Sequence, residues 1–161
     1  MSHTTPYQRI LVAIDFDHEP GVIIEKALQI ASHGDTSIRL VHCVIPVHEF
    51  YTTSYTVGGT WDSAGFLKAH QNAVDQSSDK LDMLARKFDN TDNTLEPKVL
   101  EGRVVHQILK EAQCYNADLI IVGSHCKRGM RLLLGSVANG ILHHAECDTL
   151  IIHLDKSVKS I

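Results

Sequence analysis

Hydrophobic residues along this chain follow two spacings that alternate from one end to the other. Short, continuous apolar runs are typical of strands that are covered on both faces of a parallel sheet. Between them lie longer segments in which apolar residues return every three or four positions, as on one face of a helix. The predicted strands cover residues 10–14, 38–44, 98–100, 119–122 and 150–154, and the predicted helices cover 23–31, 66–88, 105–112 and 137–143.

This alternation predicts the class of fold. The order β-α-β-α-β-α-β-α-β implies an α/β protein with a single open, mostly parallel, five-stranded sheet and helices on both faces. A length of 161 residues fits one domain over 1–161, with its core at about 7–155. Residues 45–65 form a long connection with four aromatic residues, which we interpret either as a flap over the core edge or as a lid or partner surface.

Composition excludes some classes of binding partner and indicates the cellular compartment of the protein. The formal net charge of −4 argues against nucleic acid as the main partner, because neutralising phosphates requires many cations on one face. No apolar run approaches the length of a membrane span, and the polar amino terminus lacks the apolar region of a secretion signal. The four cysteines are widely spaced without a C-x-x-C pair, which is typical of reduced thiols. We therefore expect a cytoplasmic protein without a membrane contact.

One segment reverses the sign of the overall charge. Between Asp118 and Glu146 the chain has no carboxylate, yet it contains Lys127, Arg128 and Arg131. This segment reads as a strand, a basic loop and a helix that begins near 135–136, a Gly-Ser pair. Backbone N–H groups and the positive end of the helix dipole gather at such a helix start. The pattern predicts a phosphate or other anion site, although the cations can equally belong to a solvated loop.

Several other chemistries are not supported by the sequence. It contains no G-x-G-x-x-G after the first strand, no G-x-x-x-x-G-K-[ST], no G-x-S-x-G and no H-E-x-x-H. The eleven histidines do not form pairs with metal-ligand spacing, so we expect no dedicated metal site. Cys126 lies beside cations and is either a redox-sensitive thiol or a small residue at a glycine position. His125 either tunes anion binding by its protonation or is an exposed loop residue.

The segment GSHCKRGMRLLLGSVANGILHHAECDTLIIHL resembles the last third of the universal stress protein family. That family carries a Gly-x2-Gly-x9-Gly-Ser/Thr nucleotide loop. Here Gly123 is followed by Cys126 at the second glycine position, then by eight residues and Gly135-Ser136. The resemblance extends upstream to RILVAIDFD, EKALQIA, SIRLVHCV and EGRVVHQILKEA, and only the 45–65 segment does not match.

The resemblance implies a Rossmann-like, adenine-nucleotide α-hydrolase-like fold that binds ATP, with or without Mg²⁺. Ligands of open parallel sheets bind at the carboxyl ends of the strands, where strand order reverses. Asp15 would lie near the ribose or a metal–phosphate group, unless it only caps a turn. The predicted nucleotide-binding residues are Ala13, Ile14, Asp15 and Cys43 at two strand tips, Val122, Gly123 and Cys126 along the ribose and phosphate path, and Gly135, Ser136, Val137 and Ala138 around the phosphates. Lys127, Arg128 and Arg131 are added from their charge.

The family resemblance also implies a function: a cytoplasmic homodimer, paired through the strand at Thr149–Asp155, that binds ATP and acts as a regulatory stress-response protein. Two alternatives remain open. A slow ATPase or phosphotransferase would need a metal-holding carboxylate, for which Asp15 is a candidate, and a residue that orients the nucleophile, for which the sequence offers none. An interaction module of the same fold that binds no nucleotide is favoured by Cys126 and the short spacer. We assign no catalytic residue.

Overall fold

The computed structural model describes residues 7–31, 36–46, 63–89, 93–125 and 134–154. Its sheet is five-stranded, with the order β3-β2-β1-β4-β5, and every neighbouring pair is parallel. The strands are β1 (Arg9–Ala13), β2 (Ser37–Val44), β3 (Thr94–Glu101), β4 (Leu119–His125) and β5 (Asp148–Leu154). The predicted open parallel sheet is confirmed.

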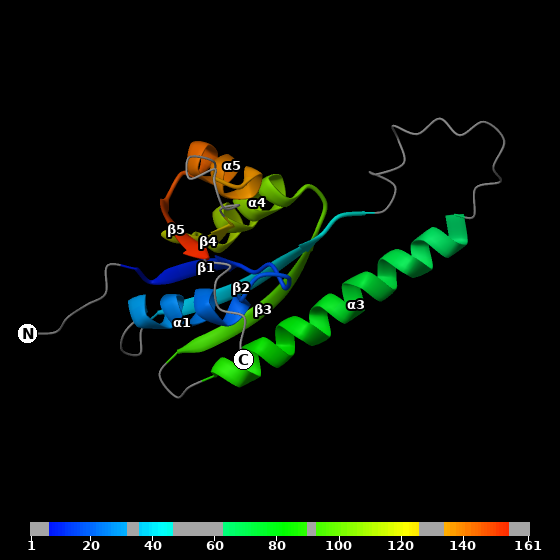
Figure 1. Cartoon of the computed structure of the whole chain (residues 1–161), viewed down its shortest axis with the longest axis horizontal. Helices are drawn as coiled ribbons and strands as arrows, with labels where there is room; N and C mark the ends of the chain where they lie inside the picture. Colours follow the sequence, from blue (N-terminus) through cyan, green and yellow to red (C-terminus); the bar gives the residue numbers. More distant parts are fainter. Residues whose placement is uncertain (1–6, 32–35, 47–62, 90–92, 126–133, 155–161) are drawn as a thin grey trace, which may run out of the picture.

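Four helices cover the two faces of the sheet. They are α1 (Pro20–Ile30), α3 (Ser63–Phe88), α4 (Val104–Tyr115) and α5 (Ser136–His144). Figure 1 shows α1 and α3 on one side of the sheet and α4 and α5 on the other. The amino-terminal half of α3 runs past the end of the sheet, where most of its side chains are exposed. In the part of the chain that the structure describes, no helix has both the length and the apolar character needed to cross a membrane.

The side chains of β1 alternate between two cores, because successive residues of a strand point to opposite faces. Ile10 and Val12 belong to the core under α1 and α3, whereas Leu11 and Ala13 belong to the core under α4 and α5. All of these positions are apolar since both faces are covered. This double burial explains why β1 reads as a continuous apolar run instead of an alternating one.

Edge position explains why β3 is longer than its predicted range of 98–100. The strand begins at Thr94 and pairs with β2 along its whole length. In the described sheet it has a neighbour on one side only, and Thr94, Pro97 and Lys98 are exposed. An edge strand therefore tolerates polar residues and a proline. Because these residues interrupt the apolar run, the sequence pattern predicted only part of β3.

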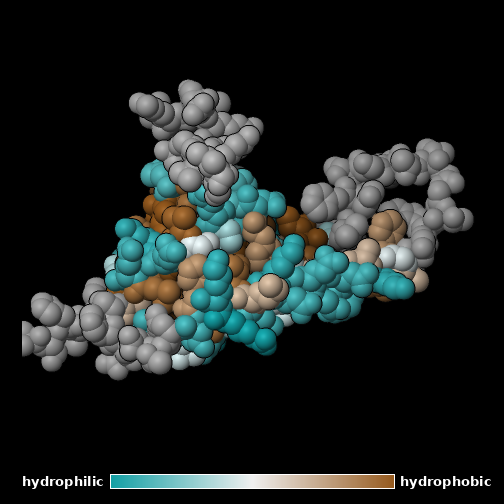
Figure 2. Space-filling model, turned by 60° about the horizontal axis from the view of Figure 1, so that its bottom comes forward, coloured by the Kyte–Doolittle hydropathy of each residue, from teal (hydrophilic) through white to brown (hydrophobic). Residues whose placement is uncertain are grey.

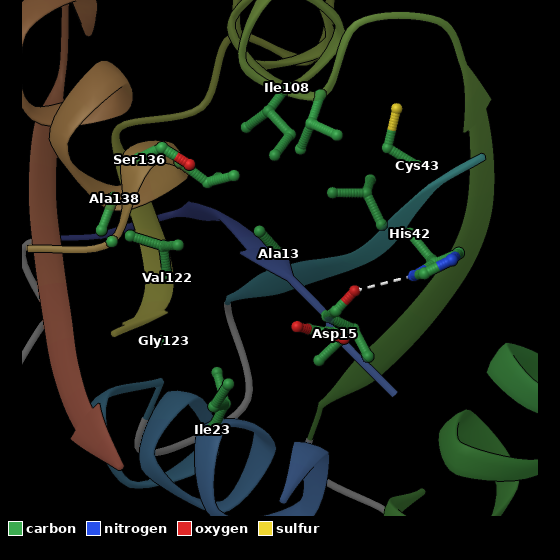
Figure 3. Close-up of a pocket in the computed structure, with 15 residues that line it drawn as sticks. Ala13, Asp15, Ile23, His42, Cys43, Ile108, Val122, Gly123, Ser136 and Ala138 are labelled. Carbon is green, nitrogen blue, oxygen red and sulfur yellow. Dashed lines mark hydrogen bonds between the residues drawn. The ribbon is translucent and has the colours of Figure 1, made fainter. Parts of the chain in front are cut away.

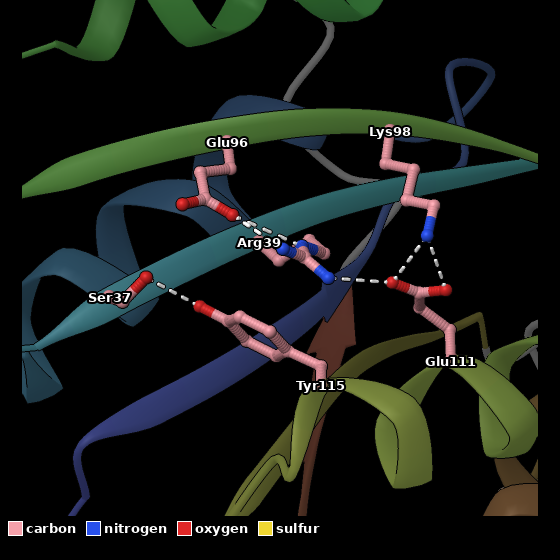
Figure 4. A network of polar contacts seen from close by, with 6 residues as sticks. All are labelled: Ser37, Arg39, Glu96, Lys98, Glu111 and Tyr115. Atoms are coloured by element: carbon pink, nitrogen blue, oxygen red, sulfur yellow. Dashed lines mark hydrogen bonds and ion pairs between the residues drawn. The ribbon is translucent and has the colours of Figure 1, made fainter.

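A network of charged side chains joins β2, β3 and α4 (Figure 4). Arg39 on β2 lies 2.7 Å from Glu96 on β3 and 2.8 Å from Glu111 on α4. Lys98 contacts the same Glu111 carboxylate at 2.8 Å. Glu111 is almost fully buried, and the two cations beside it offset the cost of removing its charge from water.

The described surface is mixed in character. The face in Figure 2 is largely hydrophilic, with hydrophobic patches between the polar areas. The large apolar side chains that are exposed come from several elements and form no single sequence cluster; they are Val22, Ile45, Leu67, Met83 and Leu142. Isolated exposed apolar residues are normal on a protein surface.

Candidate functional site

The strand-tip cavity lies at the carboxyl ends of β1, β2 and β4, next to the first turns of α4 and α5 (Figure 3). Its volume is about 360 Å³, within the range of small-molecule sites. β1 pairs with β2 on one side and β4 on the other, so the strand order reverses here. In open parallel sheets this is the position at which ligands bind.

The structure brings ten of the predicted site residues to this one cavity. They are Ala13, Ile14, Asp15, Cys43, Val122, Gly123, Gly135, Ser136, Val137 and Ala138. The other predicted residues, Cys126, Lys127, Arg128 and Arg131, lie outside the described residues. The role of all these residues in binding a nucleotide remains a prediction.

Five further residues line the cavity that were not among the predicted site residues: Ile23, Val41, His42, Val104 and Ile108. Val41 and His42 come directly before Cys43 on β2, so the predicted position of that strand tip could have indicated them. The spacing of apolar residues predicted that Ile23 and Ile108 lie on helices. This spacing does not predict whether a helical residue lies near the carboxyl ends of the strands. Only the tertiary structure identifies them.

The wall of the cavity is mostly apolar. Val41, Val122 and Ile108 belong to the core under α4 and α5 and extend it to the cavity. Gly123 has a packing role here as well. A Cβ on Gly123 would lie 2.8 Å from Ile23 Cδ1 and 2.9 Å from Leu154 Cδ1, so the absence of a side chain lets these two residues close over β4.

The amino terminus of α5 supplies hydrogen-bond donors. Gly135 is the N-cap residue and makes no side-chain cap, and the first turn contains no acidic residue. The first N–H groups of any helix lack an intrahelical partner, and the helix dipole makes this end positive. A Cβ built on Gly135 would meet no described atom within 4 Å, so the backbone is open to a ligand. These features favour an anion.

Helix α4 begins at the same cavity. Its first residue, Val104, and Ile108 one turn later are both lining residues. Like α5, α4 has neither a side-chain cap nor an acidic residue in its first turn. Two helix dipoles therefore direct their positive ends to one cavity, which strengthens its preference for negative charge.

Asp15 is engaged in the turn that follows β1. Its Oδ1 accepts a hydrogen bond from the Asp17 backbone N–H at 3.1 Å, and its Oδ2 lies 2.8 Å from His18 Nδ1. The backbone N–H of His18 also donates to the Asp15 carbonyl at 3.3 Å. The geometry therefore agrees with the turn-capping interpretation of Asp15, while the carboxylate still borders the cavity.

His42 is held in one orientation beside the cavity (Figure 3). Its Nδ1–H donates to the Ile14 carbonyl at 2.9 Å, because a carbonyl oxygen can only accept. The ring of Phe16 lies against the imidazole, with 4.2 Å between the ring centroids. The link from His42 to Ile14 ties the tip of β2 to the tip of β1 and so fixes two walls of the cavity.

Gly102, the residue after β3, positions Cys43 at the wall of the cavity. Cys43 Sγ–H donates to the Gly102 carbonyl at 3.2 Å, and the Gly102 N–H donates to the Val44 carbonyl at 3.0 Å. Gly102 has a φ of 127°, which non-glycine residues rarely adopt. This turn holds Cys43 in position at the cavity.

Ser124 is a buried polar residue at the end of β4. It is 1% exposed, and its Oγ has no hydrogen-bond partner in the described part of the chain. An unpaired buried hydroxyl costs about 1–3 kcal/mol.

Within the described residues, no group of three or more His, Cys, Asp or Glu side chains could hold a metal ion. Asp15 is the one carboxylate among the residues described as lining the strand-tip cavity, and both of its oxygens accept local hydrogen bonds.

The structure is an open parallel α/β sheet with a cavity at its switch point. The sequence profile of the universal stress protein family matches residues 6–153. The chain therefore belongs to the universal stress protein family. Universal stress protein A homolog 2 of Coxiella burnetii is 30% identical over 152 residues, which cover 94% of this chain and 98% of that protein.

Solved structures of the family share the fold. A family member from Arabidopsis thaliana, solved with AMP bound, superposes with a TM-score of 0.59 at 18% identity, covering 95% of this chain and 96% of its own. A universal stress protein solved in complex with cAMP superposes with a TM-score of 0.57 at 20% identity, covering 92% and 98%. At these identities the likeness establishes the adenine-nucleotide α-hydrolase-like fold alone.

Proposed function

We propose that this protein binds an adenine nucleotide in the strand-tip cavity, with its phosphates at the start of α5. The observation that carries the proposal is the amino terminus of α5, where uncapped N–H groups and the open backbone at Gly135 meet an apolar wall. AMP and cAMP in the two structural relatives agree with this choice of ligand.

The apolar and polar parts of the cavity suggest how the nucleotide lies. Val41, Val104 and Ile108 offer an apolar surface for the flat base, near the tips of β1 and β2. Ser136 is exposed at the start of α5, where its hydroxyl can donate to a phosphate oxygen. The positive ends of the two helices then lie next to the charged end of the ligand.

More specifically, the proposed ligand is ATP together with Mg²⁺. A bound Mg²⁺ would neutralise phosphate charge, and Asp15 is the residue that would hold it. Asp15 would then have to give up its contact with His18 or its hydrogen bond from Asp17. Lys127, Arg128 and Arg131 remain candidates for phosphate contacts on the basis of the sequence.

We place the protein among regulatory binding proteins rather than enzymes. Phosphoryl transfer needs a group that positions the nucleophile, and the described lining residues supply only Asp15 and His42 as ionisable candidates besides a thiol. Both side chains already make local hydrogen bonds. Nucleotide occupancy, instead of turnover, would then carry the stress-response signal in the cytoplasm.

A homodimer through β5 belongs to the same proposal. β5 pairs with β4 on one side and is the last strand in the described sheet order. Leu150, Ile151 and Ile152 on this strand are only half-buried. An apolar edge strand is prone to pair with another chain unless it is covered, and a second copy of β5 would cover it.

Ligand identification on protein purified without added nucleotide tests the proposal. Mass spectrometry of released small molecules should detect an adenine nucleotide, and calorimetry with ATP and AMP should give the affinity. Gly135→Val should abolish phosphate binding and leave the melting temperature within a few degrees, because φ of −55° and the open space accept a side chain. A protein that releases no nucleotide and binds none would instead be an interaction module of the same fold.

A further inference from the structure

A second cavity, the helix-end cavity, lies at the opposite ends of α4 and α5. Its volume is about 520 Å³, and its lining comes from the last turns of α4, the start of β4 and the segment between α5 and β5. Leu109, Ala112 and Ile120 form an apolar floor. Gln113, Asn116 and Glu146 add polar groups. An apolar floor with a few polar groups is the usual composition of a small-molecule site.

The two helices give the two cavities opposite electrostatic character. α4 runs from Val104 at the strand-tip cavity to Gln113 and Asn116 at the helix-end cavity. α5 runs in the same sense, from Ser136 at the first cavity to His144 at the second. Figure 1 shows the two helices together on one face of the sheet. Their carboxyl ends, which are the negative ends of the helix dipoles, therefore converge on the helix-end cavity.

The described lining of this cavity includes one carboxylate. This carboxylate belongs to Glu146, and none of the nine described lining residues is Lys or Arg. Burial raises the pKa of the Cys147 thiol, and the nearby carboxylates of Asp118, Asp148 and Glu146 raise this pKa further. The thiol is consequently neutral at physiological pH, and no positive side chain among the lining residues offsets the carboxylate.

His144 adds an acceptor. Its Nδ1–H donates to the Gly140 carbonyl at 2.8 Å, which leaves Nε2 of the neutral ring as an acceptor. Acceptors from Glu146, from the Gln113 and Asn116 amides and from this imidazole thus border one apolar floor.

We infer that the helix-end cavity binds an organic cation: an ammonium or guanidinium group on an aliphatic stem. The stem would lie on Leu109 and Ala117, the half-buried apolar residues of the described lining, and the cationic head would donate to the Glu146 carboxylate. This site is separate from the nucleotide site and does not depend on the proposed function.

The inference is tested by amide NMR titration of the full chain with agmatine, which joins a guanidinium to an ammonium through four methylenes. Amide signals of Gln113, Asn116 and Glu146 should shift, while those of Gly135 and Ser136 should not. Butyrate and 1-butanol, which have the aliphatic stem without the cation, should cause no comparable shifts. No movement at about 10 mM agmatine, or equal binding of butyrate, would overturn the inference.

Two variants make the test specific. Glu146→Gln should weaken agmatine binding by a factor of about two to five, the size expected for a lost ion pair at an exposed carboxylate. Glu25→Gln, an exposed carboxylate on α1, should leave the affinity unchanged. Equal agmatine affinity in Glu146→Gln and the unaltered protein would overturn the role of the carboxylate and with it the inference.

A second ligand separates two possible sources of the cation. Nα-acetylarginine amide presents the same guanidinium on a peptide backbone. Tighter binding of agmatine would identify a free small amine as the ligand, whereas tighter binding of the arginine derivative would identify an arginine side chain of another protein. Either result supports a cation site, and failure of both compounds to bind overturns it.

Discussion

The guanidinium of Arg39 lies 2.8 Å from the carboxylate of Glu111, joining the middle of β2 to the last turns of α4. The Glu111 side chain is only 7% exposed, so its charge is stable inside the protein only while cations accompany it. The aromatic ring of Tyr115 adds a cation–π contact to the pair, since Arg39 Cζ lies 4.0 Å from the ring centroid. This contact fastens α4, and with it one wall of both cavities, to the sheet.

Arg39→Met should lower the free energy of unfolding by roughly 2–4 kcal/mol, because it leaves Glu111 with Lys98 as its described cationic partner. Urea unfolding of the two proteins measures the difference. Combining Arg39→Met with Glu111→Leu should recover a substantial part of the loss, since no buried charge is then left. If the double variant is as unstable as the sum of the single ones, the pairing is not the cause.

Gly102 and Gly135 should respond in opposite ways to alanine. Gly102→Ala should destabilise the fold by about 1–3 kcal/mol, because φ is 127° and a Cβ would lie 2.8 Å from Gln107 Nε2. Gly135→Ala should leave stability unchanged within about 0.5 kcal/mol, because its backbone and surroundings accept a methyl group. Thermal melts of both variants, side by side, check the contrast; equal melting temperatures would refute it.

Ser124→Ala should stabilise the protein without ligand by about 1 kcal/mol, because it removes a buried hydroxyl that has no partner among the described residues. Ser77→Ala is a suitable control, as Ser77 is a buried serine on α3, away from the site. Chemical denaturation gives both values. A clear loss of stability in Ser124→Ala would mean that the hydroxyl does make a stabilising contact.

Cys147 should react with iodoacetamide more slowly than Cys114 at pH 8. Burial and nearby carboxylates raise the pKa of the Cys147 thiol, so less of it is thiolate, whereas Cys114 is the exposed thiol among the three described cysteines. Peptide mass spectrometry over time measures both rates. Because the folded pKa of Cys147 is raised, its contribution to stability is present at neutral pH and is lost as the pH rises through that pKa.

The contribution of Cys147 can be isolated with Cys147→Ser. The unaltered protein should lose stability between pH 8 and pH 10 more steeply than this variant, as the unfolded thiol ionises first. Cys114→Ser serves as the matched control and should follow the unaltered protein. Identical pH profiles for all three would show that the thiol does not titrate differently on folding.

Most of the strand positions could be predicted because β1, β2 and β4 are covered on both faces and therefore consist mainly of apolar residues, with Arg39 and His42 as polar exceptions on β2. β3 was predicted too short, since an edge strand needs no such run. Ten site residues were indicated by the family resemblance together with the strand tips and the Gly-Ser pair, and they do border one cavity. Ile108 was not indicated, because its contribution depends on the neighbours that the fold brings to it, whereas His42 comes directly before Cys43 on β2 and could have been indicated.

The sequence alone determined the succession of strands and helices along the chain, the parallel sheet and the family, because hydrophobic spacing and short motifs are local properties of the chain. The tertiary structure decided which ends of the elements meet: the starts of α4 and α5 at one cavity and their carboxyl ends at another. It also decided that Asp15 is engaged by its own turn and that Arg39 neutralises Glu111. The physical reason is that electrostatic fields and hydrogen bonds act through space, between residues that the linear sequence separates.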